Sequence, residues 1–188
     1  VSVSNQATGN TQAALNATIS GNAPITASGS FNLLAPGATD ASSLSVGMNT
    51  ASAGAISGTA TIAFVSDANN VGNCAPNCQM TLASQDVAVQ GAVYRLADPK
   101  LNTTTVTLAA RRGDAPPTAA VSVSNQSPDI YTEGLKAGFA GAAPAGFSTS
   151  GSIANLAAQG TDASSLQVAL NTGTAGSFGG NAQVNFES

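Results

Sequence analysis

The two cysteines, Cys74 and Cys78, have the most definite chemistry in this chain. They are the only cysteines among the 188 residues, four positions apart in a stretch rich in proline and asparagine. At this spacing two cysteines can meet across a tight turn, within the ~7 Å between Cα atoms that a disulfide allows. Free thiols and a metal site are the alternatives, but a metal needs two further ligands and the chain has no histidine. We expect a disulfide that closes this loop, which suits a secreted protein.

A second candidate is the tripeptide Arg112-Gly113-Asp114, the sequence that integrins read. Gly113 also suits a turn, because glycine accepts a positive φ, and Pro116-Pro117 stiffen the chain directly after it. We therefore predict a structural turn here, with an adhesive loop as the alternative.

Two aspartates, Asp40 and Asp162, recur within the repeated sequence Thr-Asp-Ala-Ser-Ser-Leu. A calcium ion takes six to eight oxygen ligands, usually from several carboxylates, and each copy of this sequence offers one. An aspartate at this place more readily starts a turn by accepting hydrogen bonds from the main chain. The sequence predicts turns and no metal.

Residues for catalysis are scarce. A Ser-His-Asp triad is impossible without histidine. Lys100 and Lys136 lie in ordinary strand or turn sequence, and Asp129 with Glu133 belongs to a stretch that we interpret as surface loop. We expect no enzyme and no cofactor.

Composition restricts the partners. Charged residues are 7% of the chain, with 5 Lys and Arg against 9 Asp and Glu and a net charge of −4. Nucleic-acid binding needs clustered basic residues, which this chain lacks. The apolar runs are far shorter than the ~20 residues of a membrane helix, so we expect no membrane insertion by this segment. A surface of Ala, Ser, Thr, Gly and Asn is frequent among secreted and cell-surface bacterial proteins.

The elements that must position these residues occur twice. Val1-Ser2-Val3-Ser4-Asn5-Gln6 recurs letter for letter from Val121, 120 residues later, and the sequence that begins at Thr39 recurs from Thr161, 122 residues later. Two residues have therefore entered the second copy, most simply Ala145-Gly146. A duplication of this length indicates tandem domains.

Apolar residues alternate with polar ones through nearly every apolar cluster of both copies, as in Ala60, Ile62 and Phe64. This period of two is typical of strands with one buried face, and glycine, proline, asparagine or aspartate separates the runs. The sequence predicts an all-β chain of two-sheet sandwiches, with a strand over Asn102–Ala110 and two further strands, roughly 81–84 and 86–96, after a polar loop over 66–80.

We expect two domains, residues 1–98 and 99–188. The first copy has no counterpart of the strand expected before the second VSVSNQ, and the second has no counterpart of the two strands expected after residue 80. We expect an opening strand to be missing from the first domain and closing strands from the second. Edges exposed in this way invite pairing with another chain.

Several short motifs carry a resemblance to a family. They are Leu34-Ala35-Pro36-Gly37, Thr50-Ala51-Ser52-Ala53-Gly54, the stretch from Gly58 to Ile62 with Ser66-Asp67, and Val106 to Asn125. Together they resemble the immunoglobulin-like ASPM/SPD-2/hydin and choice-of-anchor D-like repeats of bacterial secreted or surface proteins. The resemblance implies tandem Greek-key immunoglobulin-like sandwiches of about seven strands each, used as spacers or binding modules without enzymatic residues. The second copy departs from the pattern at Ala158-Gln159-Gly160, where the Pro-Gly turn is lost.

These observations favour a non-catalytic structural repeat of a large extracellular bacterial surface protein, a stalk, matrix or filament unit. Its partners would be neighbouring copies of itself or adjoining repeats of the same chain, joined by strand complementation. The alternative is an adhesin that binds a cell-surface or matrix ligand through its loops, over 66–80 and 111–117.

Overall fold

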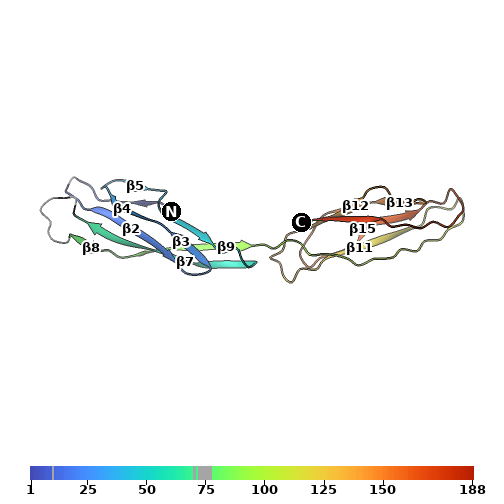
Figure 1. Cartoon of the computed structure of the whole chain (residues 1–188), viewed down its shortest axis with the longest axis horizontal. Helices are drawn as coiled ribbons and strands as arrows, with labels where there is room; N and C mark the ends of the chain where they lie inside the picture. Colours follow the sequence, from blue (N-terminus) through green and yellow to red (C-terminus); the bar gives the residue numbers. More distant parts are fainter. Residues whose placement is uncertain (10, 70, 72–77) are drawn as a thin grey trace. The chain divides into compact units, whose positions relative to one another are not determined.

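The computed structural model describes residues 1–9, 11–69, 71 and 78–188. The chain is all-β, as the alternation predicted, and the described residues contain no helix. They form two compact units, Val1–Val93 and Tyr94–Ser188, and Figure 1 labels several strands of each. The sequence placed the boundary between residues 98 and 99.

The first unit contains a larger sheet in which β2 and β7 are central. The order is β4-β2-β7, and both β8 and β9 pair with the other side of β7. Two smaller antiparallel pairs, β1 with β5 and β3 with β6, form the facing layer. The strands of this unit are β1 (Val3–Ser4), β2 (Ala14–Gly21), β3 (Ile25–Ser28), β4 (Ser30–Leu34), β5 (Thr39–Asp40), β6 (Ser45–Met48), β7 (Gly54–Asp67), β8 (Gln79–Thr81) and β9 (Gln85–Val93).

The core of the first unit comes from the inward positions of this alternation. Along β7, Ile56, Ala60, Ile62 and Phe64 are all buried, and the residues between them are more exposed. Contributions from β2, β3, β4 and Leu44 complete one cluster, with valines of β9 packed against it. Because both layers contribute to this one core, the unit is a β-sandwich.

The second unit is built from two antiparallel sheets, ordered β10-β11-β15-β13 and β14-β12-β16. Its strands are β10 (Pro99–Leu101), β11 (Thr118–Asn125), β12 (Leu135–Ala140), β13 (Phe147–Ser150), β14 (Ser152–Leu156), β15 (Thr161–Leu170) and β16 (Gln183–Glu187). The core again joins the two layers, and its buried residues are Val121, Val123, Leu135, Ala137, Ile153, Leu166 and Val168.

The two units share their strand register. In the first unit, Ile25 of β3 pairs with Met48 of β6, and in the second Phe147 pairs with Leu170 at the equivalent place. A register irregularity lies in β2 between Leu15 and Ala17 and recurs in β12 between Leu135 and Ala137. Equivalent positions are 120 residues apart up to Pro144 and 122 apart from Phe147, which agrees with an insertion of Ala145-Gly146. The immunoglobulin type of these repeats stays a prediction from the sequence.

The strand expected over Asn102–Ala110 was wrong, because the hydrogen-bonded strand ends at Leu101. Asn102 N donates to Ser122 O at 2.9 Å, and Ser122 N donates to the Thr103 hydroxyl at 3.1 Å. A side-chain hydroxyl has therefore replaced a main-chain acceptor, and no ladder continues beyond this point. Val106 still packs against the core, so the period-two burial is kept without the strand.

Gln159 lies in the turn where the second copy lacks the Pro-Gly of the first copy. Gln159 has φ 63°, close to the 77° of its counterpart Gly37. Two hydrogen bonds hold this left-handed conformation, from Gln159 N to Ser127 Oγ at 3.1 Å and from Gln159 Nε2 to Pro128 O at 3.0 Å. The same turn therefore forms from a different sequence.

Candidate functional site

Asp40 and Asp162 accept hydrogen bonds from the main chain two and three residues further on, as predicted for an aspartate that starts a turn. Asp40 ends β5, whereas Asp162 lies within β15, where the pairing with β11 is irregular. Asp40 Oδ1 accepts hydrogen bonds from Ser42 N at 3.2 Å and Ser43 N at 2.9 Å, and its Oδ2 accepts one from Ser43 Oγ at 2.7 Å. Asp162 makes the same three bonds with Ser164 and Ser165. The serine hydroxyl is the main cause that lowers the pKa of each carboxyl below 3.8, followed by the serine main-chain N–H. Both carboxylates therefore act within their own turns.

A buried asparagine joins the two sheets in each unit. Asn5 Nδ2 donates to Ala13 O at 3.2 Å and to Leu34 O at 3.0 Å, and Asn125 Nδ2 donates to the equivalent carbonyls of Glu133 and Leu156. The asparagines lie at the end of β1 and β11, whereas the acceptors belong to the facing layer. Sequence reasoning did not find this role, although the exact recurrence of VSVSNQ was the signal for it.

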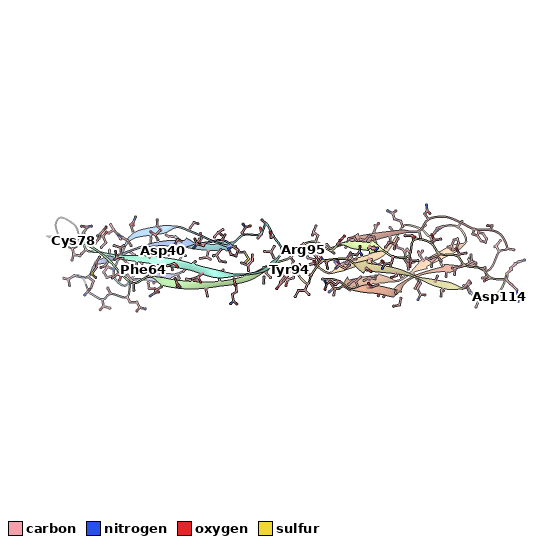
Figure 2. All side chains as sticks on the ribbon, turned by 90° about the horizontal axis from the view of Figure 1, so that it is seen from below. Asp40, Phe64, Cys78, Tyr94, Arg95 and Asp114 are labelled. Carbon is pink, nitrogen blue, oxygen red and sulfur yellow. The ribbon has the colours of Figure 1, made fainter. Side chains whose placement is uncertain are left out.

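The Arg112-Gly113-Asp114 tripeptide forms an exposed turn at one end of the second unit, where Figure 2 labels Asp114. Gly113 has φ 87°, and its N–H donates to Thr172 O at 2.9 Å. Asp114 Oδ2 accepts from Arg111 N at 3.1 Å, and Arg112 Nε donates to Gly173 O at 3.2 Å. The Asp114 side chain thus closes the turn itself, the Arg112 side chain joins the turn to Gly173, and both residues remain exposed.

The predicted disulfide between Cys74 and Cys78 lies outside the described residues, because Cys74 is not among them. The same holds for the central part of the loop over 66–80. On its described flanks, Ala68 N donates to Cys78 O at 2.9 Å. Asp67 is buried, and its Oδ2 accepts from Asn16 Nδ2 at 2.9 Å and Gln79 Nε2 at 2.7 Å. The disulfide stays a prediction.

Arg95, at the start of the second unit, is bonded to residues 129–133 by main-chain hydrogen bonds and by an ion pair. Arg95 N donates to Tyr131 O at 3.1 Å, and Glu133 N donates to Arg95 O at 2.9 Å. The Arg95 guanidinium lies 2.9 Å from Asp129 Oδ1, and the rings of Tyr94 and Tyr131 have centroids 6.0 Å apart. Asp129 and Glu133 therefore both bond to Arg95 of the same unit. The sequence analysis did not identify Arg95 as their partner.

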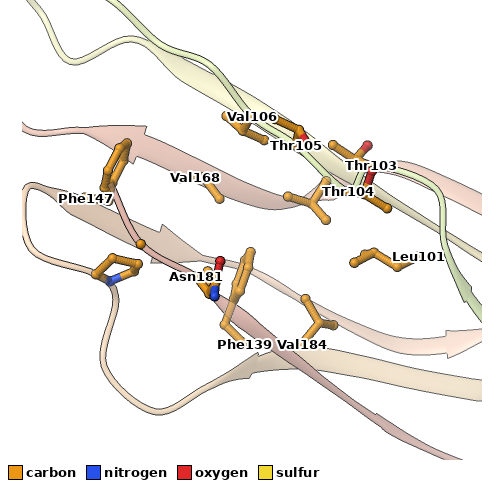
Figure 3. A pocket seen from close by; sticks show the side chains of 14 residues that line it. Leu101, Thr103, Thr104, Thr105, Val106, Phe139, Phe147, Val168, Asn181 and Val184 are labelled. Carbon is orange, nitrogen blue, oxygen red and sulfur yellow. The ribbon is translucent and has the colours of Figure 1, made fainter. Parts of the chain in front are cut away.

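The second unit also contains an apolar groove between its two sheets. Its volume is about 280 Å³, and Val121 and Val168 of one sheet and Phe139 and Val184 of the other contribute to its walls. Figure 3 shows Val106 and the threonines 103–105 on one side and Asn181 on the opposite side. The complete lining is Leu101, Thr103, Thr104, Thr105, Val106, Val121, Phe139, Pro144, Phe147, Val168, Gly180, Asn181, Ala182 and Val184.

The chemistry of this groove is that of binding. Its lining contains hydroxyl and amide groups but no titratable side chain, so it offers apolar burial with a few hydrogen-bonding groups at the rim. Within the part of the chain that is described, no cluster of three or more His, Cys, Asp or Glu residues could hold a metal ion. The described residues likewise include no helix of the length and apolarity needed to cross a membrane.

Comparison with family models finds none that matches this chain, and comparison with curated proteins finds no similar sequence. The resemblance to immunoglobulin-like surface repeats therefore stays an expectation from the sequence motifs. The function has to be inferred from the geometry of the two units.

Proposed function

We propose that this chain is a non-catalytic structural segment of a large extracellular bacterial surface protein. In this role two β-sandwich units supply a stable, weakly charged stalk, matrix or filament element, and neighbouring subunits or repeats pair with its free sheet edges. The low content of charged residues, 7%, supports an extracellular setting.

The observation that carries this proposal is the set of side-chain hydrogen bonds that both copies share. Three polar features recur with the same hydrogen bonds: the asparagine between the sheets, the aspartate turn, and a hydroxyl pair that joins Ser4 to Thr39 and Ser124 to Thr161. Each of these side chains bonds to groups of its own unit and holds strands or turns in place. The shared part of the two units is therefore a framework, which is what a repeated structural element requires.

Negative-stain electron microscopy and light scattering of the purified chain test this proposal. We expect ordered fibres or strings of particles as the concentration rises, because exposed sheet edges favour pairing between copies. Particles that stay single at all concentrations and bind cells or glycans would contradict the structural role and favour the alternative.

The alternative function is that of an adhesin, and the exposed turn of Arg112-Gly113-Asp114 favours it. The matched test is a cell-binding assay with the soluble chain and with Asp114→Glu, which keeps the charge but lengthens the side chain. An adhesive turn predicts that binding falls in the variant. Unchanged adhesion removes this alternative, because the tripeptide is then only a turn.

A further inference from the structure

The strand β16 has an unpaired edge. It pairs with β12 on one side, and among the described residues no strand pairs with the other side. In the first unit the equivalent side of β7 carries β9, which pairs with it continuously from Gly54 with Val93 to Ile62 with Gln85. The counterparts of Gly54–Ile62 are residues 176–184, and only residues 183 and 184 of these belong to β16. Residues 176–182 form no strand, and among the described residues no strand pairs with the open side of this segment.

The register identifies the positions that correspond. Ala17 pairs with Phe64 in the first unit, and Ala137 pairs with Phe186 in the second. Counting back along the chain, Ala182 corresponds to Ala60 and Gly180 to Gly58. In the first unit the strand partners of Ala60 and Gly58 are Val87 and Val89 of β9. Both valines pack against the core there.

Inward positions of β7 are buried in the first unit, where β9 is present, and their counterparts are more exposed in the second unit. Ala60 is 0% exposed and Ile62 is 3% exposed, whereas Ala182 is exposed and Val184 is half-buried. Gly180, Ala182 and Val184 all line the apolar groove. The groove thus lies beside the positions whose counterparts receive two valine side chains in the first unit.

We infer that residues 176–184, which end in the first two residues of β16, form together with this groove an acceptor site for a β-strand from another polypeptide chain. The strand runs antiparallel to residues 176–184 in the register that β9 has on β7, with β-branched apolar residues at alternate positions and small polar residues between them. Main-chain groups of residues 176–184 supply the hydrogen bonds, and the groove receives the apolar side chains. The inference rests on the proposed structural function, in which such a strand comes from a neighbouring subunit.

The chemistry of the groove favours this occupant. A strand edge beside an apolar, uncharged groove fits a peptide that offers both main-chain hydrogen bonds and apolar side chains. Among the described residues, β9 is already paired with β7 over all nine of its residues. The segment Thr103–Val106 already forms a wall of the groove. We assign the strand to a neighbouring subunit, as the proposed structural function requires.

The test uses the full chain and a fluorescent peptide with the sequence of residues 85–93, QDVAVQGAV. A control peptide replaces both valines, Val87→Ser and Val89→Ser, without a change of charge. We expect saturable binding in fluorescence anisotropy and slower hydrogen exchange of the amides in residues 176–184. The serine peptide should bind roughly tenfold more weakly or worse, since it loses two buried apolar side chains.

Two protein variants provide a matched pair. Ala182→Glu places a charge in the groove, and Gln183→Glu places the same charge at the next position, which does not line the groove. Both positions are exposed, so both variants should keep the circular dichroism and melting of the parent. Ala182→Glu should abolish peptide binding and Gln183→Glu should retain it.

The site would be disproved by the absence of saturable binding with unchanged exchange in residues 176–184, or by equal binding of the two peptides. Equal binding by the two protein variants would also overturn it. Peptide binding without any assembly of the chain would support the site and contradict the structural function. Assembly that excess peptide does not inhibit would keep that function and exclude this site as its contact.

Discussion

Replacement of the buried Asn125 by alanine should strongly destabilise the second unit. The side chain is 1% exposed, and its amide nitrogen donates to Glu133 O at 3.0 Å and Leu156 O at 3.3 Å. Its Oδ1 accepts from Asp98 N at 3.0 Å. Removal of one partner leaves each remaining buried group unsatisfied, at a cost of about 1–3 kcal/mol per group. Because some of the three groups can reach water, we expect a loss of about 3 kcal/mol in the free energy of unfolding.

The two tyrosines of the chain make the assay specific to one unit. Tyr94 and Tyr131 both lie in the second unit and the chain has no tryptophan, so tyrosine fluorescence in urea reports the unfolding of that unit. With a slope of roughly 1.5 kcal/mol per M for a domain of this size, Asn125→Ala should lower the midpoint by about 2 M. Asn5→Ala should lower the unfolding midpoint of the first unit, followed by circular dichroism, and leave the tyrosine transition unchanged.

A matched control is Asn102→Ala in the same unit. Asn102 is exposed, and its amide donates to the hydroxyls of Ser122 and Ser124, groups that water can satisfy. Its loss should cost less than about 0.5 kcal/mol. The reasoning fails if Asn125→Ala shifts the tyrosine transition no more than Asn102→Ala does, or if Asn5→Ala shifts it equally.

Three further predictions concern other parts of the framework. A Cβ at Gly151 would overlap Ser165 O at a φ of 92°, whereas Gly113 at 87° has open space around it. Thermal melting should therefore show Gly151→Ala to be destabilised by more than about 3 kcal/mol and Gly113→Ala by about 1 kcal/mol. Folding lowers the pKa of Asp162 below 3.8. The contribution of this carboxylate to stability is therefore complete above that pH and is lost as the pH falls through the lowered pKa. Between about pH 5 and about pH 2, the urea midpoint of unfolding should fall less in Asp162→Asn than in the parent. Limited trypsin digestion, followed by mass spectrometry, should show the first cleavage after Arg111 and Arg112, which are exposed and outside the strands. Lys136 lies in a strand that is paired on both sides. First cleavage after Lys136 would therefore contradict the fold.

The sequence was sufficient to predict the all-β class and the relation between the two units. Ala60, Ile62 and Phe64 alternate with polar residues and are buried as expected, because a half-buried strand imposes that period on its sequence. The recurrence of VSVSNQ and of the Thr-Asp-Ala-Ser-Ser-Leu sequence indicated a shared register, and the strand pairs agree with it. Both signals are local, so one sequence is enough to find them.

Other features depend on contacts between distant residues and gave no such signal. The residues around Val106 alternate like a strand, but the hydroxyl of Thr103 takes the place of a main-chain acceptor, and alternation alone cannot reveal this. Gln159 adopts a conformation that favours glycine because Ser127 Oγ and Pro128 O accept hydrogen bonds from its main-chain and side-chain nitrogens. The groove lies beside residues 176–184, whose counterparts in β7 pair with β9, and a difference in pairing of this kind cannot be read from the letters of the segment.

The polar framework and the groove of the second unit use different side chains. Asn125 and Asp162 belong to β11 and β15, and neither lines the groove. The fully buried residues Val123, Leu135 and Leu166 also lie outside its lining, although the groove reaches the core residues Val121 and Val168. A strand added beside residues 176–184 would therefore extend this core without contacting the framework. It follows that Asn125→Ala should change the stability of the unit without changing peptide affinity under native conditions, whereas Ala182→Glu should change affinity without changing stability. If both properties moved together in both variants, the groove would be part of the folding core and could not serve as an independent acceptor site.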